Sequence, residues 1–130
     1  MLELDSRAGE PLPAPHTIQP MRLHAMDAWV RAPAVLTDAD ALNDALHAAA
    51  AAGGATVVGE AFHAFPNGAV TGVLLLAQSH LSIHTWPELS LVNVDLLTCG
   101  NIDGGVVLRT IRARLDVERA SIRCVYRSLD

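Results

Sequence analysis

The sequence has few cysteines, no run of basic residues and no long apolar stretch. Its 130 residues include nine Lys or Arg against 14 Asp or Glu, which gives a net charge of −5. Because nucleic-acid binding needs a surplus of positive charge, this balance argues against a nucleic-acid partner. No segment approaches the roughly 18–20 apolar residues that span a bilayer, so we expect no membrane partner either.

The two cysteines, Cys99 and Cys124, are too few for the disulfide framework of a small secreted domain. Residues 1–20 are polar and proline-rich, and they lack the apolar core of a signal peptide. We therefore expect a cytoplasmic protein with two reduced thiols. Because proline opposes regular hydrogen bonding, we expect residues 1–20 to be a flexible N-terminal arm before a single domain, residues 21–130.

The apolar pattern predicts two helices among several strands. Residues 38–52 are rich in alanine and leucine, begin where Thr37 or Asp38 can cap a helix, and end at two glycines. Helical spacing of apolar residues predicts a second helix at 104–115, which Asp103 can cap. Predicted strands cover residues 23–30, 56–65, 70–77, 80–86, 91–99 and 121–126, with a turn at 66–68. The continuous apolar run 70–77 is expected to be buried along its whole length.

Clustered strands flanked by two helices predict an α+β fold. We expect a two-layer sandwich, in which a mainly antiparallel sheet carries both helices on one face. The other face would expose apolar side chains to water unless something covers it. A second subunit would do so, and we therefore expect a homo-oligomer, either a dimer or a dimer of dimers.

Nucleophiles and proton carriers are concentrated in residues 78–100. His80 and His84 would share one face of a helix, as zinc ligands do, but this segment alternates like a strand. Four residues of strand span about 13 Å, which is too far for two ligands of one zinc ion, so we expect no metal even with His63 nearby. A hydrolytic Ser–His pair is also disfavoured, because Ser79 lacks a G-x-S-x-G context.

The segment 79–88, which reads SHLSIHTWPE, resembles the processing segment of the prokaryotic S-adenosylmethionine decarboxylases, and a TCG triplet follows it at 98–100. Upstream, GGATVVGEAFHAFPNGAVTGVLLLAQSH is similar to the family pattern G-A-T…H-x-F…G-V-S-G…E-S-H. The similarity covers roughly residues 35–126. Nearer the N-terminus, Asp27 and Trp29 fit the family pattern, whereas His24 lies one position out of register.

The resemblance implies a precursor that cleaves its own backbone between Gln78 and Ser79. The Ser79 hydroxyl would attack the preceding carbonyl to form an ester, and β-elimination followed by hydrolysis would leave a pyruvoyl group derived from Ser79. In the family this ketone forms a Schiff base with a substrate amine and accepts the electrons released with CO₂. The implied reaction is decarboxylation of S-adenosylmethionine for polyamine (spermidine) biosynthesis.

The family roles transfer to five further residues of this sequence. His84 matches the histidine that assists elimination, and Thr71 stands where the family usually has a serine used in processing. Cys99 matches the thiol that returns a proton to the substrate carbon. Glu88 matches the acid that holds the ribose hydroxyls, and Phe65 matches the aromatic that stacks on adenine. In the family, the active site lies at a dimer interface and draws on both subunits.

Two other functions remain open at this stage. The same fold and chemistry serve decarboxylases of ornithine or arginine, which would have no use for Phe65 and Glu88. A non-catalytic homologue would keep the fold and act as a binding or regulatory partner of an active decarboxylase. A break at Ser79 would separate either enzyme from the non-catalytic protein.

Overall fold

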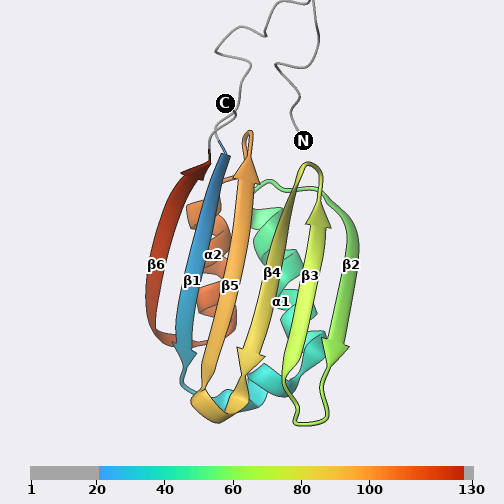
Figure 1. The fold of residues 1–130 in the computed structure, drawn as a ribbon, viewed down its shortest axis with the longest axis vertical. Helices are drawn as coiled ribbons and strands as arrows, with labels where there is room; N and C mark the ends of the chain where they lie inside the picture. The colour runs from blue at the N-terminus through green and yellow to red at the C-terminus, as the bar shows by residue number, and fades with distance from the viewer. Residues whose placement is uncertain (1–20, 128–130) are drawn as a thin grey trace, which may run out of the picture.

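The computed structural model describes residues 21–127, which form six strands and two α-helices (Figure 1). The expected N-terminal arm, residues 1–20, lies outside the described residues. In chain order the elements are β1 (Met21–Val30), a 3₁₀ turn (Pro33–Thr37), α1 (Ala39–Ala52), β2 (Val57–Ala64), β3 (Val70–Leu76), β4 (Ser79–Trp86), a second 3₁₀ turn (Pro87–Leu89), β5 (Leu91–Cys99), α2 (Gly104–Arg114) and β6 (Val117–Arg127).

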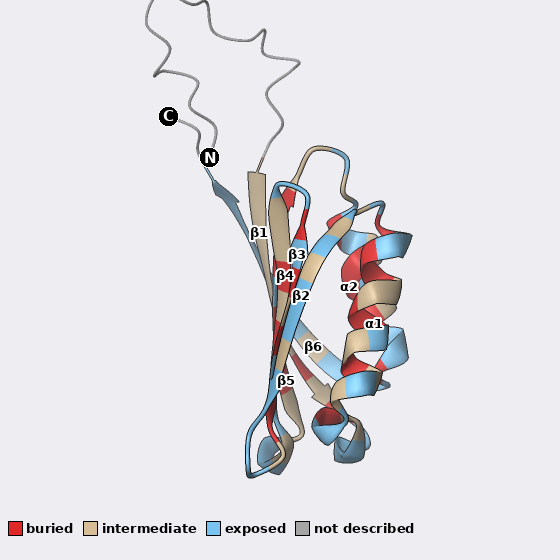
Figure 2. Ribbon diagram, turned by 90° about the vertical axis from the view of Figure 1, so that its right-hand side faces the viewer, coloured by how far each residue is buried: buried red, intermediate tan, exposed pale blue. Residues whose placement is uncertain are grey.

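The six strands form one sheet in the order β2-β3-β4-β5-β1-β6. Each neighbouring pair is antiparallel. Both helices cover the same face of this sheet, as the side view shows (Figure 2). The structure therefore confirms the predicted two-layer α+β sandwich.

Both helices begin at the aspartates that the sequence offers as caps. The Asp38 carboxylate accepts a hydrogen bond from the Ala41 amide, and Asp103 does the same for Val106. Such a bond satisfies one of the amides that the first helical turn leaves unpaired. The helix α1 ends at Gly53, and Gly54 follows with a φ of +82° that favours glycine. Helix boundaries thus match the predicted ones within a residue.

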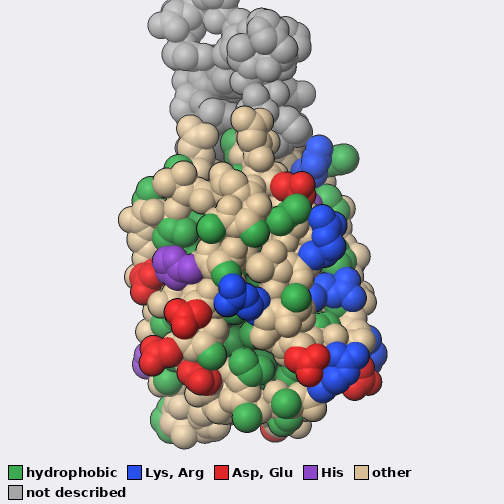
Figure 3. Space-filling model, turned by 180° about the vertical axis from the view of Figure 1, so that it is seen from behind, with side chains coloured by type: hydrophobic (Ala, Val, Ile, Leu, Met, Phe, Trp, Pro, Cys, Tyr) green, Lys and Arg blue, Asp and Glu red, His purple; other side chains and the backbone are tan. Residues whose placement is uncertain are grey.

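The hydrophobic core lies between the helices and the sheet. Each strand contributes alternate residues to it, because successive side chains of a strand point to opposite faces. The largest fully buried side chains are Met26, Leu36, Leu42, Leu46, Leu74, Leu81, Ile83, Leu96, Ile111, Leu115, Val70 and Val92. On the far side of the helices, acidic and basic side chains are dispersed among hydrophobic ones (Figure 3). Neither helix within residues 21–127 is long and apolar enough to cross a membrane.

Within residues 21–127, the second face of the sheet carries no helix, and we call it the open face. Its side chains include those of Thr71, Val73, Leu75, Ser82, His84, Trp86, Asn93, Asp95 and Asp27. Complete burial of residues 70–77 was therefore a wrong expectation: burial alternates along β3, and Leu75 is 51% exposed. The strand β6 also begins four residues earlier than the predicted 121–126.

Candidate functional site

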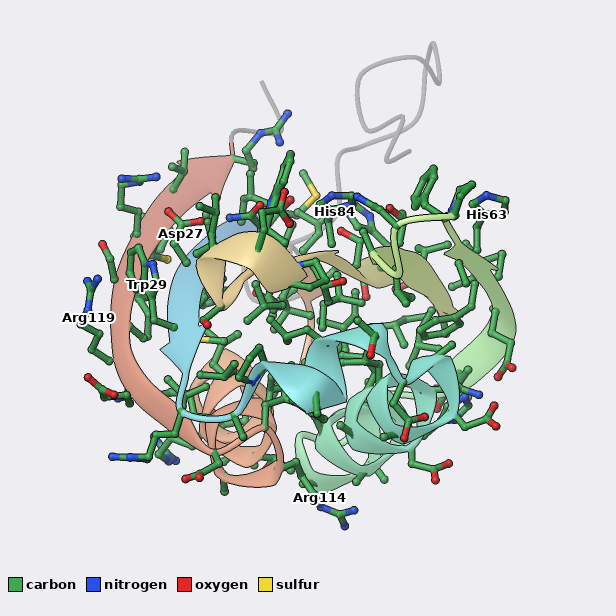
Figure 4. All side chains as sticks on the ribbon, turned by 90° about the horizontal axis from the view of Figure 1, so that it is seen from below. Asp27, Trp29, His63, His84, Arg114 and Arg119 are labelled. Atoms are coloured by element: carbon green, nitrogen blue, oxygen red, sulfur yellow. The ribbon has the colours of Figure 1, made fainter. Side chains whose placement is uncertain are left out.

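Thr71 and His84 meet on the open face. They are cross-strand partners on β3 and β4, and Thr71 Oγ1 lies 2.6 Å from His84 Nδ1. The rings of Phe65 and Trp86 approach the imidazole edge-on, with centroids 6.3 and 4.5 Å away. His84 points away from the helices, as does His63 (Figure 4). The imidazole is therefore fixed by a hydrogen bond and by aromatic packing.

A cavity of about 470 Å³ opens beside His84. It is lined by Phe65, Pro66, Asn67, Ala69, His84, Trp86 and Glu88. This size and this mostly apolar lining, with one carboxylate, are typical of a small-molecule site. The turn between β2 and β3 forms one wall, where the Asn67 side chain accepts a hydrogen bond from the Ala69 amide. Four predicted site residues, Thr71, His84, Phe65 and Glu88, thus gather at what we call the pocket end of the sheet.

The peptide bond expected to be cut lies at the opposite end of the sheet, in the β3–β4 hairpin. Only Ala77 and Gln78 connect the paired residues Leu76 and Ser79. Gln78 has a φ of +69°, a left-handed conformation that costs a non-glycine residue roughly 1–2 kcal/mol. The hairpin is held by the Ala77 amide, which donates to the Thr56 carbonyl at 2.9 Å. Backbone strain is thus stored directly before Ser79.

The Ser79 hydroxyl is buried and has no hydrogen-bond partner among residues 21–127. Ser79 lies two residues before Leu81 on β4, so both side chains point to the same face of the sheet, which is the face covered by the helices. A buried hydroxyl without a partner costs roughly 1–3 kcal/mol, which makes it a candidate for chemistry. Cys99, a half-buried free thiol, closes β5 at the same end of the sheet. Gln78, Ser79 and Cys99 therefore make up what we call the hairpin end.

The structure does not bring the hairpin end and the pocket end together within one chain. Ser79 and His84 are five residues apart on β4, which is an extended strand. That spacing corresponds to about 17 Å. Residues that share one short motif thus form two separate clusters on each chain.

A hydrogen-bonded chain on the open face was missed by the sequence analysis. The Trp86 indole N–H donates to Asn93 Oδ1 at 2.6 Å, and the side-chain Nδ2 of Asn93 donates to the Asp27 carboxylate at 2.7 Å. Asp27 also pairs with Arg123, 3.6 Å away. The register between the strands places His84, Asn93 and Asp27 in one row across the sheet. The sequence alone does not reveal this register, which is why the hydrogen-bonded chain was not predicted. The network fixes the indole that packs on His84.

His24 lies on the helix side of β1, whereas Asp27 lies on the open face (Figure 4 labels Asp27). The Nε2 atom of His24 is 3.3 Å from Thr98 Oγ1. The ring packs against the first residue of α2, since a Cβ at Gly104 would lie only 2.6 Å from Nε2. Burial, together with the positive charge of Arg22, lowers the pKa of His24 below its ordinary value. Sequence reasoning found no role for this residue.

Within residues 21–127, no three His, Cys, Asp or Glu side chains lie close enough to hold one metal ion. His80 and His84 both lie on β4, four residues apart in an extended strand. The geometric argument against a shared zinc ion therefore applies to the observed conformation as well.

The fold defines a class of protein: a two-layer α+β sandwich whose antiparallel sheet carries both helices on one face. A solved structure of this class is the adenosylmethionine decarboxylase from Aquifex aeolicus. It superimposes with a TM-score of 0.77 at 26% identity, covering 87% of this chain and 94% of that one. A family model described as S-adenosylmethionine decarboxylase matches residues 22–128. The chain belongs to the S-adenosylmethionine decarboxylase family.

Bacterial relatives named S-adenosylmethionine decarboxylase proenzyme agree with this assignment. The protein from Symbiobacterium thermophilum is 43% identical over 93 residues, which cover 71% of this chain and 70% of the relative. The one from Pseudomonas paraeruginosa is 38% identical over 89 residues, covering 68% of this chain and 56% of the relative. The match thus spans just over half of the length of the Pseudomonas protein.

Proposed function

We propose that this chain is the precursor of a pyruvoyl-dependent S-adenosylmethionine decarboxylase. The observation that carries the proposal is the Ser79 hydroxyl, which is buried without a partner directly after the left-handed Gln78. In a member of this family, a free hydroxyl beside a strained peptide bond suits an attack on that bond. The names of the relatives, which call them proenzymes, support a precursor that is processed.

The bonds that break in the proposed cleavage all belong to Gln78 and Ser79, and one water molecule is consumed. Ser79 Oγ attacks the carbonyl carbon of Gln78, the C–N bond breaks, and the hydroxyl proton ends on the freed nitrogen, which leaves an ester. Loss of the Ser79 Cα proton then expels the Gln78 carboxylate and leaves a dehydroalanine. Hydrolysis releases ammonia and converts this residue to the pyruvoyl group. Release of the strain at Gln78 favours the first step by roughly 1–2 kcal/mol.

The residues around Ser79 fit a ketone at the start of β4. When formed, the pyruvoyl group supplies the electron sink for loss of CO₂. Cys99 lies at the end of the neighbouring strand β5 and is proposed to return a proton to the substrate carbon. Its half-buried thiol can be reached by a substrate, which a fully buried cysteine could not be.

The open face suggests that the working site is shared between two copies of the chain. Within one chain, His84 lies about 17 Å along β4 from Ser79, which is too far to remove its Cα proton. Two copies related by a twofold axis would bring the open faces together, as sheets pack about 10 Å apart. If their strands run in opposite senses, the hairpin end of one copy, where Cys99 lies on the open face, meets His84, Thr71 and the cavity of the other. This arrangement would also cover exposed Leu75 and Trp86.

The cavity at the pocket end favours S-adenosylmethionine as the substrate. Phe65, which is 40% exposed, offers a ring face for adenine, and Glu88 lines the same cavity with an acceptor for ribose hydroxyls. Ornithine and arginine have neither a base to stack nor a ribose to hold. A volume of about 470 Å³ provides room for a nucleoside.

Denaturing mass spectrometry of the purified chain tests the proposal first. We expect two fragments, with the break between residues 78 and 79 and no free amine on the second fragment. Release of CO₂ should then be measured in parallel from S-adenosylmethionine, ornithine and arginine. Cleavage with release from ornithine or arginine alone would contradict the substrate, and an intact chain after long incubation would favour a non-catalytic binding protein.

A further inference from the structure

On the helix side of the hairpin end, the hydroxyls of Ser79 and Thr98 face the same interior space. We propose that Thr98, held in place by His24, accepts the hydrogen bond of the Ser79 hydroxyl and aims its oxygen at the Gln78 carbonyl. This inference rests on the proposed function, because it assigns the positioning of the nucleophile in the cleavage step.

The sheet register places the two hydroxyls beside each other. The last pair of β4 and β5 towards the hairpin is His80 with Leu97, so one further step sets Ser79 opposite Thr98. Opposite residues of antiparallel strands share a face, with Cβ atoms about 4.5–5.5 Å apart. Thr98 is 5% exposed and shares the parity of Leu96, which faces the helices. With Cβ atoms at this spacing, rotation about the Cα–Cβ bond of Ser79 can bring the two oxygens into hydrogen-bond distance.

The hydrogen bonds of Thr98 leave room for one more donor. Its hydroxyl donates to the Arg22 carbonyl at 3.3 Å, and His24 Nε2 lies 3.3 Å from the same oxygen. A hydroxyl has one proton and two lone pairs. If Nε2 carries the proton and donates to Thr98, one lone pair stays free. In the part of the chain that the structure describes, no side chain bonds to Ser79 Oγ, whose burial also keeps water away.

His24 is a positioning residue because it acts through Thr98. The role needs a proton on Nε2, and the lowered pKa of His24 favours a neutral ring that can carry it there. The ring is confined by the start of α2, where any side chain larger than that of Gly104 would collide with Nε2. At the end of the acyl shift, the Ser79 proton resides on the freed nitrogen, so Thr98 and His24 regain their starting state.

This assignment separates the two steps of cleavage between two sets of residues. Thr98 and His24 lie at the hairpin end and would serve the attack that forms the ester. His84 and Thr71 lie at the pocket end, about 17 Å away on the same chain, and would serve the later elimination from a second copy.

The test compares Thr98→Val, which keeps the shape and removes the hydroxyl, with Thr98→Ser, which restores it. The first-order rate of cleavage is followed by denaturing electrophoresis and mass spectrometry, with and without hydroxylamine, which cuts esters. We expect Thr98→Val to be cleaved at least about tenfold more slowly than the natural chain, with no acceleration by hydroxylamine. Thr98→Ser should recover most of the rate. In contrast, His84→Ala should accumulate an ester that hydroxylamine cuts.

A second pair of variants keeps the inference testable if Thr98→Val does not fold, as circular dichroism would show. His24→Gln retains an N–H donor and should be cleaved faster than His24→Leu, which has none. Cleavage of folded Thr98→Val at the natural rate would overturn the inference, as would equal rates for both His24 variants. Hydroxylamine cutting of a stalled Thr98→Val chain would also overturn it. An uncut natural chain would instead overturn the proposed function itself, and this inference with it.

Discussion

Two inactive variants of this chain should restore cleavage when they are produced together. Ser79→Ala removes the nucleophile, and His84→Ala removes the group proposed to act on it from the second copy. Each variant alone should remain uncut. In a mixed pair, however, the hairpin end of the His84→Ala chain, which keeps Ser79, lies next to an intact His84 on the other chain. That one site has every proposed residue, while the other site of the pair has lost both.

The expected yield follows from random pairing. Equal amounts of the two variants give about half of the pairs as mixed pairs, each with one complete site out of two. About a quarter of all chains should therefore be cleaved, and the decarboxylase activity should be about a quarter of that of the natural protein. The shared site is expected because Ser79 and His84 of a single chain are about 17 Å apart. If each site instead used residues of one chain only, a mixture of the two variants would give no cleavage.

Co-expression with two different affinity tags, followed by purification over both, isolates the mixed pairs. Mass spectrometry then shows which chain is cut, and we expect this to be the His84→Ala chain alone. Mixed pairs that are recovered but remain uncut would refute the shared site. Complete cleavage of His84→Ala on its own would refute the role of His84.

Four further results are expected. Cys99→Ala should be cleaved at a nearly unchanged rate but lose about a hundredfold or more in turnover, measured as CO₂ release, and full turnover would remove its role as proton donor. Glu88→Gln should raise the KM for S-adenosylmethionine about tenfold while any activity on ornithine stays the same; equal losses would contradict the ribose contact. Gly72→Ala should lower the free energy of unfolding in urea by about 1–3 kcal/mol, because a Cβ there would lie 2.1 Å from the Phe62 ring, and an unchanged stability would contradict this packing. Because burial and the Arg22 charge lower the pKa of His24 in the folded chain, the free energy of unfolding should fall as the pH drops below about 6.5, where the unfolded chain gains this proton first. The His24→Gln chain should lose less stability over the same range, and identical pH profiles would show that His24 does not contribute.

The architecture followed from local patterns. Alternation predicted β4, and an aspartate before an alanine-rich or apolar segment marked the start of each helix. These features depend on the side-chain period of each element and on capping chemistry, both of which can be read from neighbouring residues. The burial of 70–77 was predicted wrongly, because an apolar run does not reveal how many faces of its sheet are covered.

The candidate site was predicted as a set of residue types and not as an arrangement. The motif at 79–88 named Ser79 and His84 together, although strand geometry separates them. The conformation of Gln78 was not predicted either, because glutamine has no preference for positive φ and the hairpin imposes it. The neighbours of Thr98 and Asn93 depend on register between strands that are distant in sequence.

His24 lies one position later than the histidine of the family pattern, and this difference matters because successive side chains of a strand point to opposite faces. A histidine one position earlier would lie on the open face with Asp27, whereas His24 faces α2 and Thr98. Sequence comparison registers this as a poor match to a pattern. In the folded chain it transfers an imidazole from one side of the sheet to the other.

The order of the strands also determines what happens to the molecule after a break at Ser79. The piece that ends at Gln78 contains β1, β2, β3 and α1, and the piece that begins at Ser79 contains β4, β5, β6 and α2. The strand β1 of the first piece lies between β5 and β6 of the second, and β3 pairs with β4. Backbone hydrogen bonds of these three strand pairs therefore hold the two pieces together. The mature protein would therefore stay assembled as one body without a covalent link, and only the first residue of β4 would be released from its tether.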